Sequence, residues 1–329
     1  MRALVVGLGS MGRRRARLLK EYFSAELRGV DGRADRREQA QRELGLECRA
    51  DLDEALEDFS TDCALICTSP LSHAGLIREL LERGLHVFTE INLTSEGYAE
   101  NTALARKKKL TLFLSSTQLY RGELKWIAKR AEAEKGPLVY RYHVGQYLPD
   151  WHPWESIKDY FVGDRRTNGC REIMAIEFPW LERAFGKIRG FKSEARRLTS
   201  LPLDFPDCFF ISLEHEGGAE GRLMIDLACR RASRRLEIVG EDIYTSWGGT
   251  PDTLFDFDTN TGEYKQIETG EEALRDKRYA ENIVENAYID ELAAFIKTLG
   301  GEEALRHSFE DDERLLGIID RIEGEALIK

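Results

Sequence analysis

The segment Ala3-Leu4-Val5-Val6-Gly7-Leu8-Gly9-Ser10-Met11-Gly12 decides the fold of this chain. An apolar run of strand length leads into G-x-G-x-x-G, and a helical pattern follows from Arg13 to Tyr22. At such a strand-to-helix turn the glycines permit a tight turn, close approach of the backbone to a pyrophosphate, and close packing of helix on strand. The N–H groups at the helix start attract phosphate. We therefore expect a dinucleotide site formed by Gly7, Gly9, Ser10, Met11 and Gly12.

The next strand-like stretch indicates which dinucleotide binds. The stretch Leu27 to Val30 reads as a short strand and is followed by Asp31, 19 residues after Gly12. An acidic side chain there accepts a hydrogen bond from the ribose 2′-OH and repels a 2′-phosphate. Arg33 is placed to stack on adenine or to reach a 2′-phosphate. The sequence predicts NAD as the cofactor and leaves NADP as the alternative.

Strand and helix patterns alternate through the first third of the chain. Strands are expected at 2–6, 26–31, 63–67, 85–89 and 110–114, and helices at 10–22, 33–43, 51–57, 71–83 and 94–107. This alternation predicts an α/β fold, a doubly wound parallel sheet of Rossmann type. Ligands of such sheets bind beyond the carboxyl ends of the strands, where Thr68, Ser69 and Glu90 are expected to line the cofactor site.

The pattern changes after about residue 118. Strand-like alternation recurs at 138–147, 208–213, 222–228 and 236–239, with helices expected at 168–185, 281–299 and 309–326. Closely spaced strands predict an α+β domain with an open, mostly antiparallel sheet. The expected division is a cofactor domain at 1–118 and a substrate-binding and oligomerisation domain at 119–329, with the C-terminal helices able to pack back on the first domain.

Composition narrows the class of protein. The 329 residues carry a formal charge of −11, which argues against nucleic acid or an anionic membrane as a partner. No apolar run approaches the ~20 residues of a membrane span. The six cysteines lack C-x-x-C spacing, so neither a zinc site nor a disulfide framework is expected. Because the first residues already read as a strand, no signal peptide is expected and the cytoplasm is the predicted location.

Several motifs together resemble the Gfo/Idh/MocA family, named for glucose-fructose oxidoreductase and inositol dehydrogenase. They are the glycine turn, Ala64-Leu65-Ile66-Cys67-Thr68-Ser69-Pro70 with His73, Val87-Phe88-Thr89-Glu90, the segment Gly169 to Gly186, Tyr288-x-x-Glu291-x-x-x-Phe295, and Ser308-Phe309-Glu310-Asp311. The resemblance covers nearly the whole chain. It implies NAD(P)-dependent oxidation or reduction of a sugar, cyclitol or similar polyol, in a homodimer or homotetramer joined through the second sheet.

Two positions depart from the family pattern. The resemblance implies a lysine where Ile91 stands in Glu90-Ile91-Asn92, and a proton-accepting histidine where Ile176 stands, four residues after the acid Glu172. Isoleucine cannot exchange a proton. Either other groups perform the proton transfer or the redox reaction has been lost.

Four residues are candidates for that proton transfer. Glu172 matches the family's acid, and a carboxylate in a dehydrated cleft acquires a raised pKa. Glu177 is on the same expected helix but points about 140° away from Glu172, so the two do not form a tight pair. His152 has an ordinary pKa near neutrality, and Tyr147 offers a hydroxyl nearby in sequence. Glu172 has a structural alternative as a salt bridge with Arg171 or another arginine, and His152 has one as part of an aromatic cluster that seals a domain interface.

The remaining site candidates concern the substrate. The segment from Gly145 to Glu155 is rich in aromatic and polar groups suited to the apolar faces and hydroxyls of a sugar. It resembles family members of surface-polysaccharide gene clusters, which favours an amino sugar or a nucleotide sugar. His73 is expected to cap or line the nicotinamide side of the cofactor site. The predicted substrate residues are Asn92, Tyr120, Gln146, Trp151, Trp154 and Arg165.

Two functions remain open from the sequence alone. In the first, the protein moves hydride between nicotinamide C4 and a sugar-like carbon. In the second, it binds the cofactor without net redox turnover, as a sensor or partner-binding module, or as a lyase or epimerase with tightly held NAD. The intact motifs favour the first reading, and the isoleucines at 91 and 176 favour the second.

Overall fold

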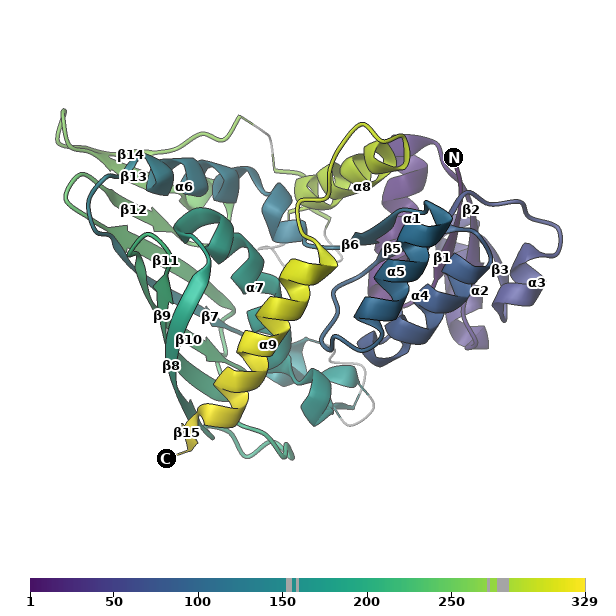
Figure 1. Ribbon diagram of the computed structural model, residues 1–329, viewed down its shortest axis with the longest axis horizontal. Coiled ribbons are helices and arrows are strands. Elements are labelled where there is room, and N and C mark those ends of the chain that lie inside the picture. The colour runs from purple at the N-terminus through teal and green to yellow at the C-terminus, as the bar shows by residue number, and fades with distance from the viewer. Residues whose placement is uncertain (152–155, 158–159, 271–272, 277–283, 329) are drawn as a thin grey trace. The chain divides into compact units, whose positions relative to one another are not determined.

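The computed structural model in Figure 1 describes residues 1–151, 156–157, 160–270, 273–276 and 284–328. The chain divides into two compact units. The first unit comprises Met1–Ser116 and Tyr288–Glu313, and the second comprises Thr117–Ala287 and Arg314–Lys329. The first division therefore lies two residues before the expected boundary at 118, and the segment 288–313 groups with the cofactor domain rather than with its neighbours in sequence.

The first unit is built on six parallel strands in the order β3-β2-β1-β4-β5-β6, the order of dinucleotide-binding Rossmann sheets. The strands are β1 (Arg2–Val6), β2 (Glu26–Val30), β3 (Glu47–Arg49), β4 (Cys63–Ile66), β5 (His86–Thr89) and β6 (Leu112–Leu114). Every residue of the central strand β4 is buried, as expected for a parallel strand covered on both faces. The predicted doubly wound parallel sheet is confirmed.

Helices cover both faces of this sheet (Figure 1). They are α1 (Ser10–Phe23), α2 (Ala34–Leu44), α3 (Leu52–Leu56), α4 (His73–Glu82), α5 (Tyr98–Lys108) and, from the far end of the chain, most of α8 (Asn286–Leu299). The prediction of a helix from residue 94 is wrong at its start. Gly97, at the N-cap of α5, has φ +72°, a left-handed conformation that turns the chain just before the helix begins.

Aromatic side chains hold α8 on the sheet of the first unit. The Phe295 ring meets the Phe88 ring at 5.4 Å and the Phe113 ring at 5.6 Å, both edge to face. The apolar face of α8 therefore belongs to the core of the first unit.

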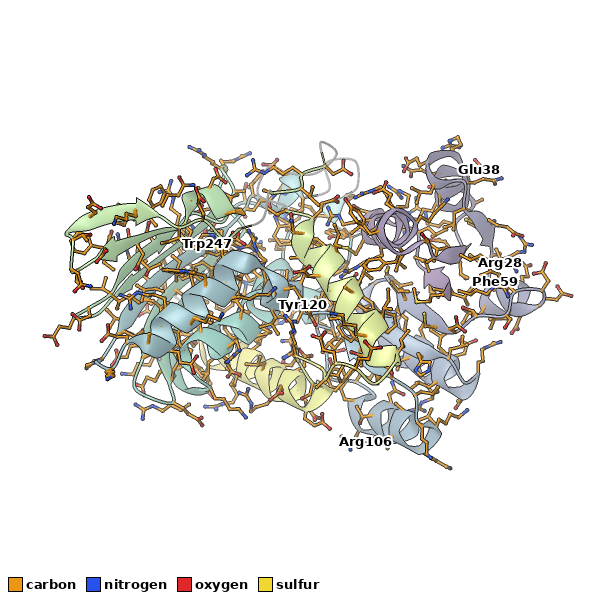
Figure 2. The ribbon with its side chains drawn as sticks, turned by 90° about the horizontal axis from the view of Figure 1, so that it is seen from above. Arg28, Glu38, Phe59, Arg106, Tyr120 and Trp247 are labelled. Atoms are coloured by element: carbon orange, nitrogen blue, oxygen red, sulfur yellow. The ribbon has the colours of Figure 1, made fainter. Side chains whose placement is uncertain are left out.

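At the other end of the sheet the Arg28 guanidinium lies 4.7 Å from the Phe59 ring centre, where Figure 2 shows the two side chains together.

The second unit contains a sheet of nine strands in the order β14-β13-β12-β11-β7-β10-β9-β8-β15. Its strands are β7 (Val139–Gly145), β8 (Ile188–Arg196), β9 (Cys208–His215), β10 (Glu220–Asp226), β11 (Ser233–Val239), β12 (Tyr244–Trp247), β13 (Phe255–Asp258), β14 (Glu263–Gln266) and β15 (Leu327–Ile328). Two pairs, β7–β10 and β8–β15, are parallel and the other pairs are antiparallel. The predicted mostly antiparallel sheet is confirmed.

One face of this sheet is covered by helices, among them α7 (Gly169–Phe185) and the second-unit part of α9 (Phe309–Glu325). Tyr140 of β7 stacks on Phe185 of α7 with ring centres 4.2 Å apart. Trp180 of α7 meets Trp247 of β12 edge to face at 6.2 Å, and Figure 2 labels Trp247 among these strands. Ser193 of β8 donates a hydrogen bond to the Ile322 carbonyl of α9. The residues that alternate with these point to the other, open face.

Several elements of the second unit were not predicted, namely α6 (Gly122–Ala133), β8 and β12 to β15. The strand β14 has the sequence Glu-Tyr-Lys-Gln and all four of its residues are exposed. It is held by pairing with β13, and its side chains carry no alternation of burial that a sequence pattern could reveal. Within the described ranges no helix combines the length and apolarity needed to span a membrane.

Candidate functional site

The glycine turn of the first unit has the shape that a pyrophosphate requires. Gly7 has φ +92°, and a Cβ at Gly12 would lie 1.8 Å from the Gly7 carbonyl oxygen, so neither position accepts a larger residue. At Gly9 the nearest atom to a Cβ would be Nη1 of Arg36 at 3.8 Å, which leaves the backbone open to a ligand. Helix α1 begins at Ser10 with no side-chain cap, so its first N–H groups are available. These residues fit a dinucleotide pyrophosphate.

Asp31 follows β2 and faces the same turn. Its Oδ2 accepts a hydrogen bond from the Leu8 N–H at 2.8 Å, and its Oδ1 accepts one from the Arg33 N–H at 2.9 Å. A carboxylate retains further acceptor sites for a ribose hydroxyl. The Arg33 guanidinium pairs with Asp35 at 2.7 Å. Arg36, which was not among the predicted site residues, lies 3.8 Å from Asp31 Oδ2 and contributes the positive charge beside the turn.

His73 is a buried link between two strand ends of the first unit. One ring nitrogen, Nδ1, lies 2.6 Å from Asn92 Oδ1 and the other, Nε2, lies 3.1 Å from the Thr68 carbonyl oxygen. Burial lowers the pKa of His73, so the ring is neutral at pH 7. Asn92 is itself only 3% exposed. This environment favours an architectural role for both residues, including Asn92, which was predicted to contact substrate.

Glu90 belongs to a buried charge cluster around Arg15 of α1. The Arg15 side chain is fully buried and binds Glu90 Oε1 and Glu291 Oε2, each at 2.6 Å. Glu291 also accepts a hydrogen bond from the Ser116 N–H at 2.6 Å. Burial lowers the pKa of Arg15, but the two carboxylates outweigh it and hold that pKa above its ordinary value. Glu90, predicted to bind the cofactor, therefore has a structural partner within the first unit.

Glu172 lies in the first turn of α7 in the second unit. Its Oε2 atom is buried and has no hydrogen-bond partner among the described residues, although the residue as a whole keeps some exposed surface. Burial raises the pKa of Glu172 to about 8. Ile176, one helical turn further on, is likewise only partly buried. A carboxyl with a spare oxygen and a pKa near neutrality has the properties of a general acid or base.

Glu177 is placed differently, inside the core of the second unit. It is fully buried and accepts hydrogen bonds from the Tyr142 hydroxyl, Trp180 Nε1 and Arg234 Nη2, each at 2.6 Å. Its charge and its acceptor sites are engaged by groups on β7, α7 and β11. The arrangement is that of a structural ion pair, whereas Glu177 was predicted as a candidate for proton transfer.

Tyr147 and Trp151 lie in a loop that follows β7. The Tyr147 N–H donates to the Cys229 carbonyl at 2.7 Å, and Trp151 Nε1 donates to the Gln146 carbonyl at 3.3 Å. The guanidinium of Arg230 lies 3.5 Å from the centre of the Tyr147 ring. Arg230 was not among the predicted site residues, because an arginine in a loop carries no sequence signal that separates binding from solvation.

The other predicted residues are distributed over the second unit. Tyr120 (labelled in Figure 2) is 3% exposed in the short helix Thr117–Tyr120, whereas Arg165 is exposed before α7. His152 and Trp154 lie outside the described residues, so their roles remain predictions. Among the side chains that the structure describes, no group of three or more His, Cys, Asp or Glu is arranged to hold a metal ion.

Comparison with known proteins agrees with this picture of the first unit. Residues 1–116 match the model of the family GFO_IDH_MocA, an oxidoreductase family with an NAD-binding Rossmann fold. Myo-inositol 2-dehydrogenase of Thermotoga maritima is 26% identical over 328 residues, which are 96% of this chain and 93% of that protein. Biliverdin reductase A of Mus musculus is 33% identical over 134 residues, 40% of this chain and 44% of its own length.

Solved structures share the fold along the whole chain. UDP-N-acetylglucosamine 3-dehydrogenase from Acidithiobacillus ferrooxidans superposes with a TM-score of 0.75 at 16% identity, covering 99% of this chain and 97% of that one. Biliverdin reductase from Synechocystis, in complex with biliverdin and NADP+, gives 0.74 at 17% identity, covering 99% and 98%. The predicted nicotinamide dinucleotide cofactor is confirmed at the level of the family. Residues 1–116 therefore carry the NAD-binding Rossmann domain of the Gfo/Idh/MocA oxidoreductase family.

Proposed function

We propose that the protein transfers hydride to or from a carbon of a sugar-like or nucleotide-sugar substrate, with Glu172 exchanging the hydroxyl proton. The observation that carries the proposal is the buried Glu172 Oε2, which has no partner among the described residues. When bound, NAD or NADP supplies a hydride acceptor or donor at nicotinamide C4. In the oxidation, the C–H bond breaks with its electron pair, the hydroxyl proton passes to the Glu172 carboxylate, and the C=O bond forms.

Glu172 is favoured over the other candidates by its surroundings. Ile91 and Ile176 occupy the positions of the family's lysine and histidine, and neither can take a proton. Glu177 is engaged by three donors in the core. The Tyr147 ring is stacked against Arg230. Glu172 has an oxygen without a hydrogen-bond partner in the described part of the chain, and burial raises its pKa to about 8.

The experiment is turnover with a panel of polyols, amino sugars and nucleotide sugars, followed by the absorbance of the reduced cofactor. We expect Glu172→Gln to lower kcat by about 10²–10⁴-fold while NAD binding is kept, because proton transfer contributes on this scale. The wild-type oxidation rate should rise with pH through about 8 and the reduction rate should fall. Glu172→Asp is the matched variant that restores an acid. Unchanged turnover in Glu172→Gln would refute the assignment.

The second function, cofactor binding without net redox turnover, is favoured by one observation, the pair Ile91 and Ile176. It predicts that NAD binds while no member of the panel changes the absorbance of the cofactor. A lyase or epimerase with tightly held NAD would in addition release cofactor only on denaturation, and would convert substrate without added NAD. Substrate conversion followed by NMR separates these outcomes from hydride transfer.

We further propose that the protein is a homodimer or homotetramer joined through the open face of the second-unit sheet. Exposed apolar side chains on several of its strands support this, among them Val139 on β7, Phe210 on β9, Val239 on β11 and Tyr264 on β14, each between 43% and 51% exposed. The strand register places Val139 directly opposite Val239 on this face. Isolated exposed apolar residues are ordinary, but several on one continuous sheet face indicate an interface.

A further inference from the structure

Four arginines surround the connection between β10 and β11 in a chain whose formal charge is −11. Arg234 is neutralised by Glu177 at 2.6 Å. Arg230 and Arg231 are exposed, and no carboxylate of the described chain lies within ion-pair distance of either. Two guanidinium groups without an ion-pair partner among the described residues form a local excess of positive charge, in a protein that has more acids than bases.

Arg230 is oriented as well as charged. Its guanidinium lies 3.5 Å from the centre of the Tyr147 ring. Such stacking holds the guanidinium plane without consuming its charge, and leaves the N–H groups at its edge free to grip an anion in a bidentate manner. An arginine that served only solubility would not need a partner of this kind, and we regard the stacked pair as a preformed anion receptor.

The pair rests on a rigid support. The loop after β7 is hydrogen-bonded to the loop after β10 through Tyr147 N–H to the Cys229 carbonyl at 2.7 Å and Leu148 N–H to the Leu227 carbonyl at 3.1 Å. Asp226 Oδ1 accepts from the N–H groups of Ala228 and Cys229, at 2.9 and 2.7 Å. These bonds fix the backbone on both sides of the stacked pair, so little conformational entropy is lost when a ligand binds.

The same support carries the start of α7. A Cβ at Gly169 would lie 2.9 Å from Leu227 Cδ2 and 3.4 Å from Leu148 Cδ1, so the first turn of the helix packs directly on the two loops. Glu172 belongs to that turn. The stacked pair and the proposed proton-exchanging carboxyl are therefore built on one corner of the second unit, formed by β7, β10 and α7.

We propose that Arg230, stacked on Tyr147 and assisted by Arg231, binds an anionic group of the substrate, so that the substrate is an acidic sugar rather than a neutral polyol. This inference rests on the proposed function, because it assigns the substrate of the same site. The anionic group is a phosphate or a carboxylate located away from the reacting carbon, as in a nucleotide-linked sugar or a sugar acid.

The test is calorimetric titration of the full-length protein in saturating NAD, which keeps the glycine turn occupied. UDP, glucuronate and glucose are the probes, so that a diphosphate, a carboxylate and a neutral sugar are compared. We expect UDP or glucuronate to bind at least about 10-fold more tightly than glucose, and Arg230→Ala to lose about 10-fold or more of that affinity. Arg230→Lys, which keeps the charge but not the stacked fork, should lose less.

Arg235→Ala is the matched control. Arg235 is exposed and lies only five residues after Arg230, but it is on β11, where it pairs with His143 of β7 on the open face of the sheet. The Arg235→Ala variant should bind both anions as the wild type does. Equal affinity of the Arg230→Ala and wild-type proteins for both anions would overturn the inference, as would a loss of the same size in Arg235→Ala. The better probe identifies the substrate anion as diphosphate or carboxylate.

The two proposals fail separately. If turnover depends on Glu172 but Arg230→Ala leaves kcat/KM unchanged for every substrate of the panel, the anion site is wrong and the hydride-transfer function stands. If anion binding depends on Arg230 but no substrate is turned over, the anion site stands and the hydride-transfer function is wrong.

Discussion

At the scale of single residues, the raised pKa of Glu172 affects both the proposed proton transfer and the stability of the folded protein. Its folded-state pKa of about 8 lies above the ordinary value of 4.5, so between these pH values the folded protein holds a proton that the unfolded chain has released. The contribution of Glu172 to the free energy of unfolding therefore falls as pH rises from about 4.5 to about 8. It is constant below and above that window.

Glu172→Gln should remove this pH-dependent contribution. We expect the difference in Tm between variant and wild type to grow in favour of the variant from pH 5 to pH 8.5, by at least about 2 °C, since a domain of this size shifts by a few degrees per kcal/mol. Thermal unfolding followed by circular dichroism measures the difference in Tm between variant and wild type. The other titrating groups are the same in both proteins, so their contributions cancel. A difference that stays constant across this range would show that the carboxyl titrates normally.

Asp31 and Arg36 are expected to set the choice of cofactor in opposite directions. Asp31→Ser removes the charge that repels a 2′-phosphate and should improve NADP binding relative to NAD by about 10-fold or more. Arg36→Ala, which removes the cation 3.8 Å from Asp31, should weaken NADP more than NAD. Fluorescence titration with each cofactor measures both ratios. A wild type that prefers NADP would contradict the assignment of NAD from Asp31.

At the scale of elements, Arg15 of α1 joins the residue that follows β5 to helix α8. It is fully buried between Glu90 and Glu291, residues 75 and 276 positions away in the sequence. Arg15→Met would leave two buried carboxylates without their cation, and we expect a loss of about 3–5 kcal/mol in the free energy of unfolding. Urea denaturation of the full chain measures it.

Arg106→Met is the matched control for that substitution. Arg106 of α5, labelled in Figure 2, also pairs with a residue of the segment 288–313, Glu310, but both side chains are more than half exposed. Solvent-exposed ion pairs contribute little, so almost no change in stability is expected. Equal losses in the two variants would mean that burial does not govern these pairs. The triple variant Arg15→Met, Glu90→Gln, Glu291→Gln should recover part of the loss, because no buried charge is then left unpaired.

At the scale of the whole molecule, the open sheet face predicts self-association. Phe210→Arg would place a charge in the middle of an apolar interface and should shift the wild-type oligomer toward the 37.6 kDa monomer. Leu198→Arg is the control, since Leu198 is 53% exposed but lies in the loop between β8 and β9. Size-exclusion chromatography with light scattering gives the masses. A monomeric wild type at micromolar concentration would contradict the interface.

Most of the first unit could be predicted from sequence, although the short edge strand β3 was not predicted. Apolar runs at β1 and β4 alternate with helical periodicity, and the glycine turn has steric requirements that only glycine meets. These features depend on residues fewer than about 20 positions apart, so they can be recognised from the sequence. The second-unit sheet was only partly predictable, because strands such as β14 are held by hydrogen bonds to a neighbour rather than by their own pattern.

The sequence by itself therefore determined the Rossmann architecture, the dinucleotide turn and the acidic residue that follows it. Only the tertiary structure decided the roles of the charged side chains. It pairs Glu177 with Arg234 and places Glu90 and Glu291 on Arg15. It leaves Glu172 Oε2 without a hydrogen-bond partner in the described ranges and stacks Arg230 on Tyr147. The physical reason is that the role of a charged side chain depends on its burial and on partners distant in the chain, and the spacing of residues in the sequence does not show either.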